Sequence, residues 1–295
     1  MDEDPFMKSS DPSSAKVAIR LTSTTAVCSR AVAGLILILS MTGPLAIASA
    51  DASPTSNVAY PTGISNVGEP SGLGPPAADA MPGYTQNYVN DFTVNSFPTG
   101  WSGFNGVPGG DPGAHFDSRH ITVSAGLLRL NTWQDPRYQN GWVTGGLCQC
   151  GLSRIYGAYF VRSRVTGPGP NEVQLLWPIN DKWPPEIDFS ETGSGVAGTT
   201  STVHWGVSNM MEHRQVRINM MKWHTFGVVW TRASIVYVVD GSAWASVPTP
   251  PRVPRVRMRL DLEQRTMCAL GRQCPSRPVS MLVDWVAEYI PTAPK

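Results

Sequence analysis

Residues 256–263 read Val-Arg-Met-Arg-Leu-Asp-Leu-Glu, and this alternation of apolar and charged residues decides the fold class. Successive side chains of a β-strand point to opposite faces, so the stretch predicts a strand with one apolar and one charged face. Similar short runs, separated by clusters of Gly, Pro, Asn and Asp, occur at 126–131, 156–165, 173–177, 223–230, 234–239 and 281–289. No stretch of ten or more residues has the apolar spacing of a helix. The sequence therefore predicts an all-β sandwich or barrel.

An export signal is predicted for residues 1–50. An apolar stretch spans 31–47 and is followed by Ala48-Ser49-Ala50, and the basic residues that precede it are Lys8, Lys16, Arg20 and Arg30. A basic region, an apolar region and small residues at a cleavage site are typical of a secretory signal. Retention as a membrane anchor is the alternative, but polar residues interrupt the stretch, which is shorter than the ~20 residues of a span. We therefore expect a secreted, extracellular protein with no stable membrane association after cleavage.

Composition separates a linker from a folded domain in the rest of the chain. Residues 51–83 are rich in Pro, Ser, Gly, Ala and Asn and poor in large apolar side chains, which predicts a disordered linker. All ten tryptophans lie beyond residue 100. The predicted folded domain spans 84–291 and has the size of one ordinary domain.

The cysteines outside the predicted signal indicate disulfide bonds. Cys28 lies in the signal, which leaves Cys148, Cys150, Cys268 and Cys274. An even number of cysteines in an exported chain favours disulfides, and no histidine lies at the spacing of a zinc finger. Four cysteines allow three pairings, and the spacing alone does not choose among them.

The charge of the chain argues against a nucleic-acid partner. The formal net charge is +1 and only 15% of the residues are charged. Beyond the amino-terminal region there is no run of Lys or Arg that would follow a phosphate backbone. We therefore expect no binding to nucleic acid.

Three acidic residues stand close together in the segment Glu186-Ile-Asp188-Phe-Ser-Glu191. On a regular strand Glu186 and Asp188 share a face, whereas Glu191 has the opposite parity. Glu191 joins that face only if one extra residue is inserted as a β-bulge, most simply at 189–190. The acids thus predict a bulge in their own strand.

Crowded carboxylates suit the cleavage of a glycosidic bond. Repulsion among them raises the pKa of at least one, so that a protonated acid stands beside a charged one. Retaining glycosidases need this division, because one carboxylate attacks the anomeric carbon and another, ~5 Å away, protonates the leaving oxygen. The alternative is a solvated strand face, which is the commoner fate of alternating acids.

At these residues the chain resembles glycoside hydrolase family 16, whose signature is Glu-x-Asp-x-x-Glu or Glu-x-Asp-x-Glu on a sandwich strand. Segment 186–191 matches the longer, bulged form, and the segments 156–162, 223–241 and 283–286 also resemble strands of the family. The resemblance implies a concanavalin A-like jelly-roll β-sandwich with a sugar-binding cleft on its concave face. It also implies that Glu186 is the nucleophile, that Glu191 is the general acid and then base, and that Asp188 orients the pair and tunes its pKa.

The resemblance further implies a secreted retaining endo-hydrolase, or a transglycosylase if the cleft excludes water. The longer motif is similar to that of laminarinases and agarases, so we expect a β-1,3- or mixed-linkage β-glucan as substrate. After Met258, however, many members continue with Asn-Leu and a glycine pair, whereas this chain has a charged strand. A monomer with a polysaccharide as its partner is the expected form.

Five further residues are predicted to bind substrate. Tryptophan faces stack on pyranose rings, which favours Trp177 and Trp183 as cleft walls and adds Trp205 as a candidate; burial in the core is the alternative for each. His204 is a candidate for a hydrogen bond to an acid or to a sugar hydroxyl, and Gln264 is a candidate for a sugar contact. A structural histidine and an exposed strand end are the respective alternatives.

The expected reaction requires no cofactor. Asp284 matches a position that, in some members of the resembled family, helps to bind a structural calcium, and the resemblance implies the same role here. A calcium ion needs six or more oxygen ligands. A non-catalytic carbohydrate-binding module is the main alternative function, because fold does not fix function. A polysaccharide lyase is a third reading, but the sequence lacks the Tyr, His and Arg cluster that a lyase would need.

Overall fold

The computed structural model describes residues 59–248 and 252–292. The predicted export signal and the first residues of the predicted linker therefore lie outside the described residues. The described chain is built almost wholly of antiparallel strands, and the helical elements bounded within it are the short 3-10 helices η1 (Ser118–His120), η2 (Pro136–Tyr138) and η4 (Cys268–Leu270). No helix among the described residues is long and apolar enough to cross a membrane.

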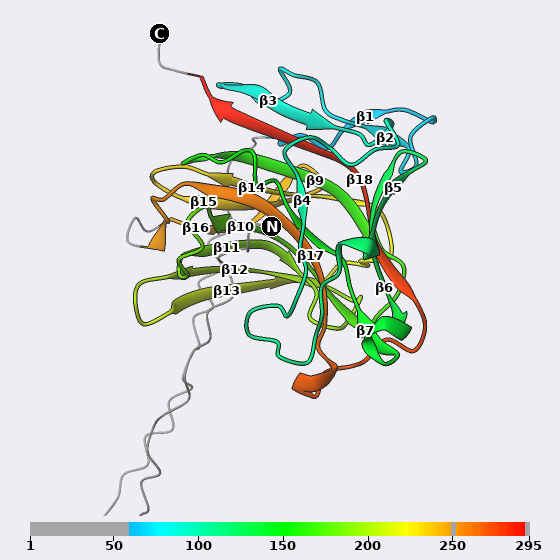
Figure 1. Ribbon diagram of the computed structural model, residues 1–295. Helices are drawn as coiled ribbons and strands as arrows, with labels where there is room; N and C mark the ends of the chain where they lie inside the picture. The colour runs from blue at the N-terminus through cyan, green and yellow to red at the C-terminus, as the bar shows by residue number, and fades with distance from the viewer. Residues whose placement is uncertain (1–58, 249–251, 293–295) are drawn as a thin grey trace, which may run out of the picture. The chain divides into compact units, whose positions relative to one another are not determined.

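Two large sheets form the sandwich (Figure 1). The strands of the seven-stranded sheet are, in spatial order, β13 (Met210–Val216), β12 (Thr199–Trp205), β11 (Glu186–Glu191), β10 (Pro170–Pro178), β17 (Met258–Thr266), β8 (Gly146–Cys148) and β4 (Ser102–Gly103). The main path of the nine-stranded sheet runs through β16 (Ser242–Val247), β15 (Ile235–Val239), β14 (His224–Trp230), β9 (Gly157–Val165), β18 (Val279–Pro291), β6 (Leu127–Asp135) and β5 (Ile121–Ser124). Two flanking strands complete it, β3 (Tyr84–Asn90) beside β18 and β7 (Gly141–Val143) beside β6.

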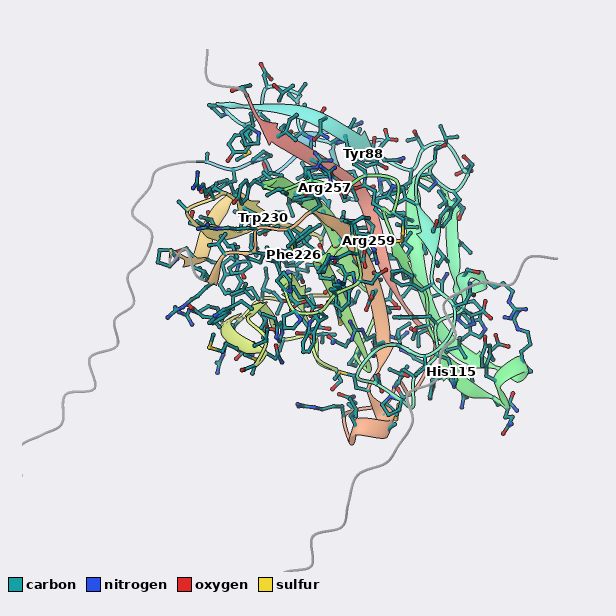
Figure 2. All side chains as sticks on the ribbon, turned by 60° about the vertical axis from the view of Figure 1, so that its left-hand side comes forward. Tyr88, His115, Phe226, Trp230, Arg257 and Arg259 are labelled. Carbon is teal, nitrogen blue, oxygen red and sulfur yellow. A yellow bond between two sulfur atoms is a disulfide. The ribbon has the colours of Figure 1, made fainter. Side chains whose placement is uncertain are left out.

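The alternation in the sequence builds the core between these sheets. In β17 the apolar residues Met258, Leu260 and Leu262 are fully buried and belong to the main hydrophobic cluster. From the opposite sheet, Phe226 and Trp230 of β14 reach into the same cluster (Figure 2). Every run that is predicted to be extended overlaps a strand, and the predicted jelly-roll β-sandwich is confirmed.

The structure corrects the predicted linker at residues 59–83. This segment contains a two-stranded sheet, β1 (Ile64–Ser65) and β2 (Leu73–Gly74), and packs on β18. The indole of Trp285 donates a 2.9 Å hydrogen bond to the carbonyl of Leu73, and the Tyr289 hydroxyl donates one of 2.9 Å to the carbonyl of Ala77. These bonds use backbone oxygens of the segment, so the segment is ordered although it has few apolar side chains.

The four cysteines pair locally. The structure joins Cys148 to Cys150 and Cys268 to Cys274, which selects one of the three pairings that the sequence left open. Cys148 ends β8 in the seven-stranded sheet, and the second pair closes the loop that follows β17. Each disulfide therefore closes a short local segment of the chain.

Candidate active site

Strand β11 carries the three acids and contains the predicted bulge. Towards β12, Asp188 pairs with Thr202 and Glu191 with Thr200, so that residues 189–190 lie opposite a single residue. Towards β10 the register also shifts, because the partners of Ser190 and Asp188 are adjacent in sequence. The bulge at 189–190 is thereby confirmed.

The bulge brings the three acids to one face of the sheet. Their partners on β12 are His204 for Glu186, Thr202 for Asp188 and Thr200 for Glu191. These partners alternate along β12 and therefore share a face. The intervening apolar residues Ile187 and Phe189 are fully buried in the core between the sheets.

Burial makes two of these carboxyls harder to ionise. Glu186 is 8% exposed and Asp188 is 5% exposed. Burial raises the pKa of Glu186, while a 2.7 Å hydrogen bond from the indole Nε1 of Trp183 to Oε2 opposes that rise. Burial also raises the pKa of Asp188 well above its ordinary value, and the charges of Glu186 and Glu191 raise it further. Asp188 therefore retains a proton more readily than an ordinary aspartate, which lessens the repulsion among the three acids.

Glu191 occupies a more open position at the end of β11. Its side chain is partly exposed. The amide of Asn171 on β10 donates a 2.8 Å hydrogen bond to Oε1, and the Asn171 Oδ1 accepts a 2.7 Å bond from the backbone N–H of Gly193. Asn171, which the sequence did not single out, thus orients the Glu191 carboxylate.

His204 lies beside the acids. Its Nδ1 is 2.8 Å from Asn209 Oδ1, and its Nε2 is 3.8 Å from Asp188 Oδ2. The imidazole also lies 5.6 Å from the ring of Trp183. Among the described residues, one set of three side chains could hold a metal ion, with ligand atoms within 4.8 Å of one another, and it consists of Glu186, Asp188 and His204.

A cavity of about 490 Å³ adjoins Glu186. Trp177 and Trp183 form part of its wall, and Phe104 and Phe116 line it as well. A volume of this size is ordinary for a small-molecule site. Flat aromatic surfaces next to carboxylates suit a sugar chain, because they contact its C–H faces while the acids reach its oxygens.

The charged face of β17 forms another part of this cavity. Its residues are Arg259, Asp261, Glu263 and Arg265. Strand β17 pairs with β10, where Arg259 lies opposite Trp177 and Glu263 lies opposite Val173. Strand β10 pairs in turn with β11, so the charged row lies two strand spacings, roughly 10 Å, from the acids of β11. The sequence predicted the charged face but did not assign it to the site. Its signal was the alternation itself, which placed every charge of the strand on one side.

The β17 row is internally paired. Arg259 Nε lies 3.1 Å from Asp261 Oδ1, and Arg265 Nε lies 2.6 Å from Glu263 Oε2. Burial raises the pKa of Asp261 well above its ordinary value, and the neighbouring Arg259 opposes that rise. The row therefore offers both donors and acceptors to a ligand.

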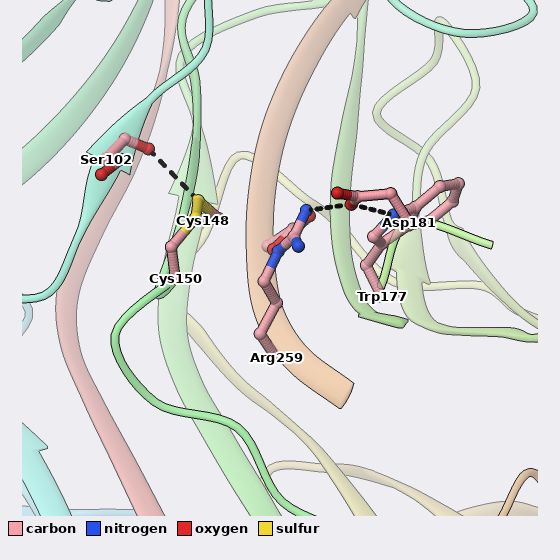
Figure 3. The surroundings of a disulfide bond; sticks show 7 residues. Ser102, Cys148, Cys150, Trp177, Asp181 and Arg259 are labelled. Carbon is pink, nitrogen blue, oxygen red and sulfur yellow. Dashed lines mark hydrogen bonds and ion pairs between the residues drawn. A yellow bond between two sulfur atoms is a disulfide. The ribbon is translucent and has the colours of Figure 1, made fainter. Parts of the chain in front are cut away.

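Asp181 connects Trp177, on the wall of the cavity, with Arg259 of β17 (Figure 3). Its Oδ1 accepts a 3.0 Å hydrogen bond from the indole of Trp177 and lies 2.9 Å from Arg259 Nη2. Asp181 stands in the loop between β10 and β11, which also carries Trp183. One carboxylate thus fixes the orientation of Trp177 relative to β17.

Two of the predicted substrate contacts are wrong. Trp205 follows His204 on β12 and therefore points to the opposite face, where it packs on the hydrophobic core. Gln264 is fully buried, and its amide lies between the strands of the two sheets. There its amide nitrogen donates a 2.8 Å hydrogen bond to the carbonyl of Leu130, and its amide oxygen accepts one of 3.0 Å from the backbone N–H of Met281. Gln264 is therefore neither a sugar contact nor an exposed strand end.

Asp284 lies in the other sheet, on β18, and is fully buried. Its Oδ2 accepts a 3.2 Å bond from the backbone N–H of Ser71, and its Oδ1 has no protein partner. Burial raises its pKa, and the charge of Arg162 opposes that rise. The free carboxylate oxygen fits a calcium ligand, although the nearby guanidinium disfavours a cation, and calcium at Asp284 stays a prediction.

Comparison with known proteins agrees with this geometry. The family model of glycosyl hydrolases family 16 matches residues 116–262, which include the three acids and most of β17. A curated relative, the endo-1,3-1,4-beta-glycanase ExsH of Rhizobium meliloti, is 34% identical over 144 residues, which are 47% of this chain. That alignment covers 31% of the relative, so the chain spans about a third of its length.

Solved structures share the fold. The laminarinase catalytic domain of Thermotoga maritima superposes with a TM-score of 0.63 at 15% identity, over 71% of this chain and 99% of that one. A mixed-linkage-glucan GH16 protein of Bacteroides ovatus, solved with an oligosaccharide product, gives a TM-score of 0.58 at 16% identity, over 68% and 99%. At such identities the likeness concerns the fold alone.

Proposed function

Because this chain belongs to glycosyl hydrolases family 16, we propose that it is a secreted endo-hydrolase that cleaves a β-1,3- or mixed-linkage β-glucan with retention of configuration. The observation that carries the proposal is the bulge in β11, which aligns Glu186, Asp188 and Glu191 on the face that adjoins the aromatic cavity. A binding module has no need for crowded carboxylates at such a place. The names of the relatives support a β-glucan as the substrate class.

In the proposed reaction, Glu186 attacks the anomeric carbon while Glu191 protonates the leaving oxygen. The Trp183 bond to Glu186 favours the charged form that a nucleophile needs. Water then attacks the glycosyl-enzyme ester, and Glu191 takes the proton of that water. Asp188 holds a proton between the two glutamates, which reduces the cost of their charges at close range.

Asn171 and Asp181 supply the positioning in this proposal. The Asn171 amide restrains the Glu191 carboxylate from the β10 side. Asp181 holds Trp177 so that a pyranose ring can stack beside Glu186. Preorganised groups of this kind lower the barrier because they need not reorient during the reaction.

Export is supported by the two disulfides. Bonds such as Cys148–Cys150 and Cys268–Cys274 form and persist in oxidising compartments. Together with the signal-like pattern at residues 1–50, they favour release to the outside of the cell. Amino-terminal sequencing of protein recovered from the medium tests this, with cleavage expected before Asp51.

The activity is tested by release of reducing ends from laminarin, lichenan, agarose and xyloglucan by the purified protein and by Glu186→Gln. We expect laminarin or lichenan to be cut and the variant to be inactive. Transfer products in place of free sugar ends would indicate a transglycosylase. Binding of a glycan with no cleavage by either protein would overturn the enzyme assignment in favour of a carbohydrate-binding module.

A further inference from the structure

Beneath the three acids, a chain of buried side chains reaches the backbone of Glu191. The bulge turns Ser190 into the sandwich, where it is fully buried. Its hydroxyl donates a 3.1 Å hydrogen bond to Glu172 Oε2 and lies 2.9 Å from the hydroxyl of Thr199. The backbone N–H of Glu191 donates a 2.8 Å bond to that Thr199 oxygen.

These bonds form one continuous chain from the backbone of Glu191 to the carboxyl of Glu172. A backbone N–H only donates, so Thr199 Oγ1 accepts from Glu191. When the Glu172 carboxylate is charged, Ser190 donates to it and the hydroxyl of Thr199 donates to Ser190. Each hydroxyl then donates once and accepts once, and the carboxyl at the end also accepts from the amide of Gln174. Such an ordered series is stronger than separate bonds, because each bond polarises the next.

The bulge explains why Glu191 needs this support. A bulge interrupts the ladder of backbone bonds and leaves groups of the bulged strand without strand partners. At Glu191 the backbone N–H takes a side-chain oxygen as its acceptor, and the Thr200 hydroxyl donates a 3.0 Å bond to the Glu191 carbonyl. The network therefore replaces ladder bonds at the residue that must stay in place.

We infer that Glu172, Ser190 and Thr199 are positioning residues that hold Glu191 at its working place in the cleft. The inference rests on the proposed role of Glu191 as the acid and base. None of the three reaches the cleft, since Glu172 and Thr199 are 1% exposed and Ser190 is 0% exposed. A substitution among them therefore acts on the reaction through Glu191 and not through a lost sugar contact.

The test is Thr199→Val, which keeps the shape of the side chain and removes its hydroxyl. On β-glucan we expect kcat to fall by roughly 10- to 100-fold, with KM changed by less than about two-fold, because proton transfer to the leaving group is impaired. On a 2,4-dinitrophenyl β-glycoside kcat/KM should fall by less than about three-fold, since this parameter reports formation of the glycosyl-enzyme and this leaving group departs without protonation. Thr199→Ser restores the hydroxyl and should restore the rate on β-glucan.

Ser201→Ala is the matched control. Ser201 lies on the same strand, is fully buried, and its hydroxyl has no partner among the described residues. It should leave both rates close to those of the wild type. Equal losses of Thr199→Val on both substrates, or no loss on either, would overturn the inference.

A second measurement does not depend on activity. Exchange of the Glu191 backbone amide with solvent, followed by NMR, should become about ten-fold faster in Thr199→Val and stay unchanged in Ser201→Ala. If the wild type cleaves neither substrate, the proposed function fails, and this exchange rate alone decides the inference. An unchanged rate in Thr199→Val would then refute it.

Discussion

The indole nitrogen of Trp183 donates a 2.7 Å hydrogen bond to Oε2 of Glu186, three residues along the chain. Trp183 is 45% exposed at the wall of the cavity, whereas Glu186 is nearly buried. One residue therefore offers a flat face to a ligand and at the same time stabilises the charge of the proposed nucleophile. Binding and reactivity are coupled through this single bond.

Replacing Trp183 with Phe should shift the pH dependence of the reaction. The hydrogen bond lowers the pKa of Glu186 against the effect of burial, so its loss raises that pKa. The nucleophile must be charged, and the acidic limb of kcat/KM should therefore move to higher pH. A pH profile between 4 and 9 measures the shift.

Trp177→Phe is the control for that shift. Its indole lines the same cavity but donates to Asp181 and not to Glu186. We expect a higher KM and an acidic limb at its original place. If both variants moved the limb equally, the effect would come from the cavity in general, and the role of the Trp183 bond would be wrong.

Substitution of Asp181 by Ala should weaken binding more than chemistry. Asp181 joins Trp177 to Arg259, and neither is a proposed reacting group. We expect KM to rise roughly five- to ten-fold, the equivalent of one lost hydrogen bond of about 1 kcal/mol, with kcat within about two-fold of the wild type. Steady-state kinetics on lichenan or laminarin would show this. Asp79→Ala, at an exposed position, serves as the control.

Removal of residues up to 83 should destabilise the protein. Trp285 and Tyr289 are fully buried and donate to carbonyls of the 59–83 segment, so they would lose both cover and acceptors. A chain that begins at residue 84 should lose at least about 3 kcal/mol of unfolding free energy relative to one that begins at residue 59. Urea unfolding compares the two, and identical midpoints would return this segment to the status of a linker.

Glu172 should make stability depend on pH. Burial raises its pKa from 4.5 to about 7, so between these values the folded protein holds a proton that the unfolded chain releases. The free energy of unfolding should therefore fall as pH rises through this window, by about 3 kcal/mol at most. Glu172→Gln does not ionise, so the wild type should lose unfolding free energy relative to this variant as the pH rises from 4.5 to about 7. Parallel profiles would mean that Glu172 ionises normally in the fold.

Much of the sandwich could be predicted from the sequence, because apolar and polar residues alternate along a half-buried strand. The apolar side of β17 was visible in this way. The parity of Glu191 relative to Glu186 likewise predicted the bulge, since the acids could share a face only with one residue inserted. Strand β13 escaped prediction because it is an edge strand whose residues are mostly exposed and show no alternation.

Other parts of the site depend on neighbours that a sequence does not name. The charges of Arg259 and Asp261 line the cavity only because β17 lies beside β10 in the sheet. Gln264 continues the same strand with the opposite parity, which sends it into the core. The 59–83 segment is held through its backbone carbonyls, and composition carries no information about these bonds.

Chemical rescue with azide tests the central claim, the division of labour between Glu186 and Glu191, most directly. Both Glu186→Gly and Glu191→Gly should be almost inactive on β-glucan. In the rescue assay, each variant is mixed with an aryl β-glycoside and sodium azide. The account predicts an α-glycosyl azide from Glu186→Gly, because azide replaces the nucleophile, and a β-glycosyl azide from Glu191→Gly, because azide attacks the glycosyl-enzyme ester. The reverse assignment of anomers, or the same anomer from both variants, would contradict it.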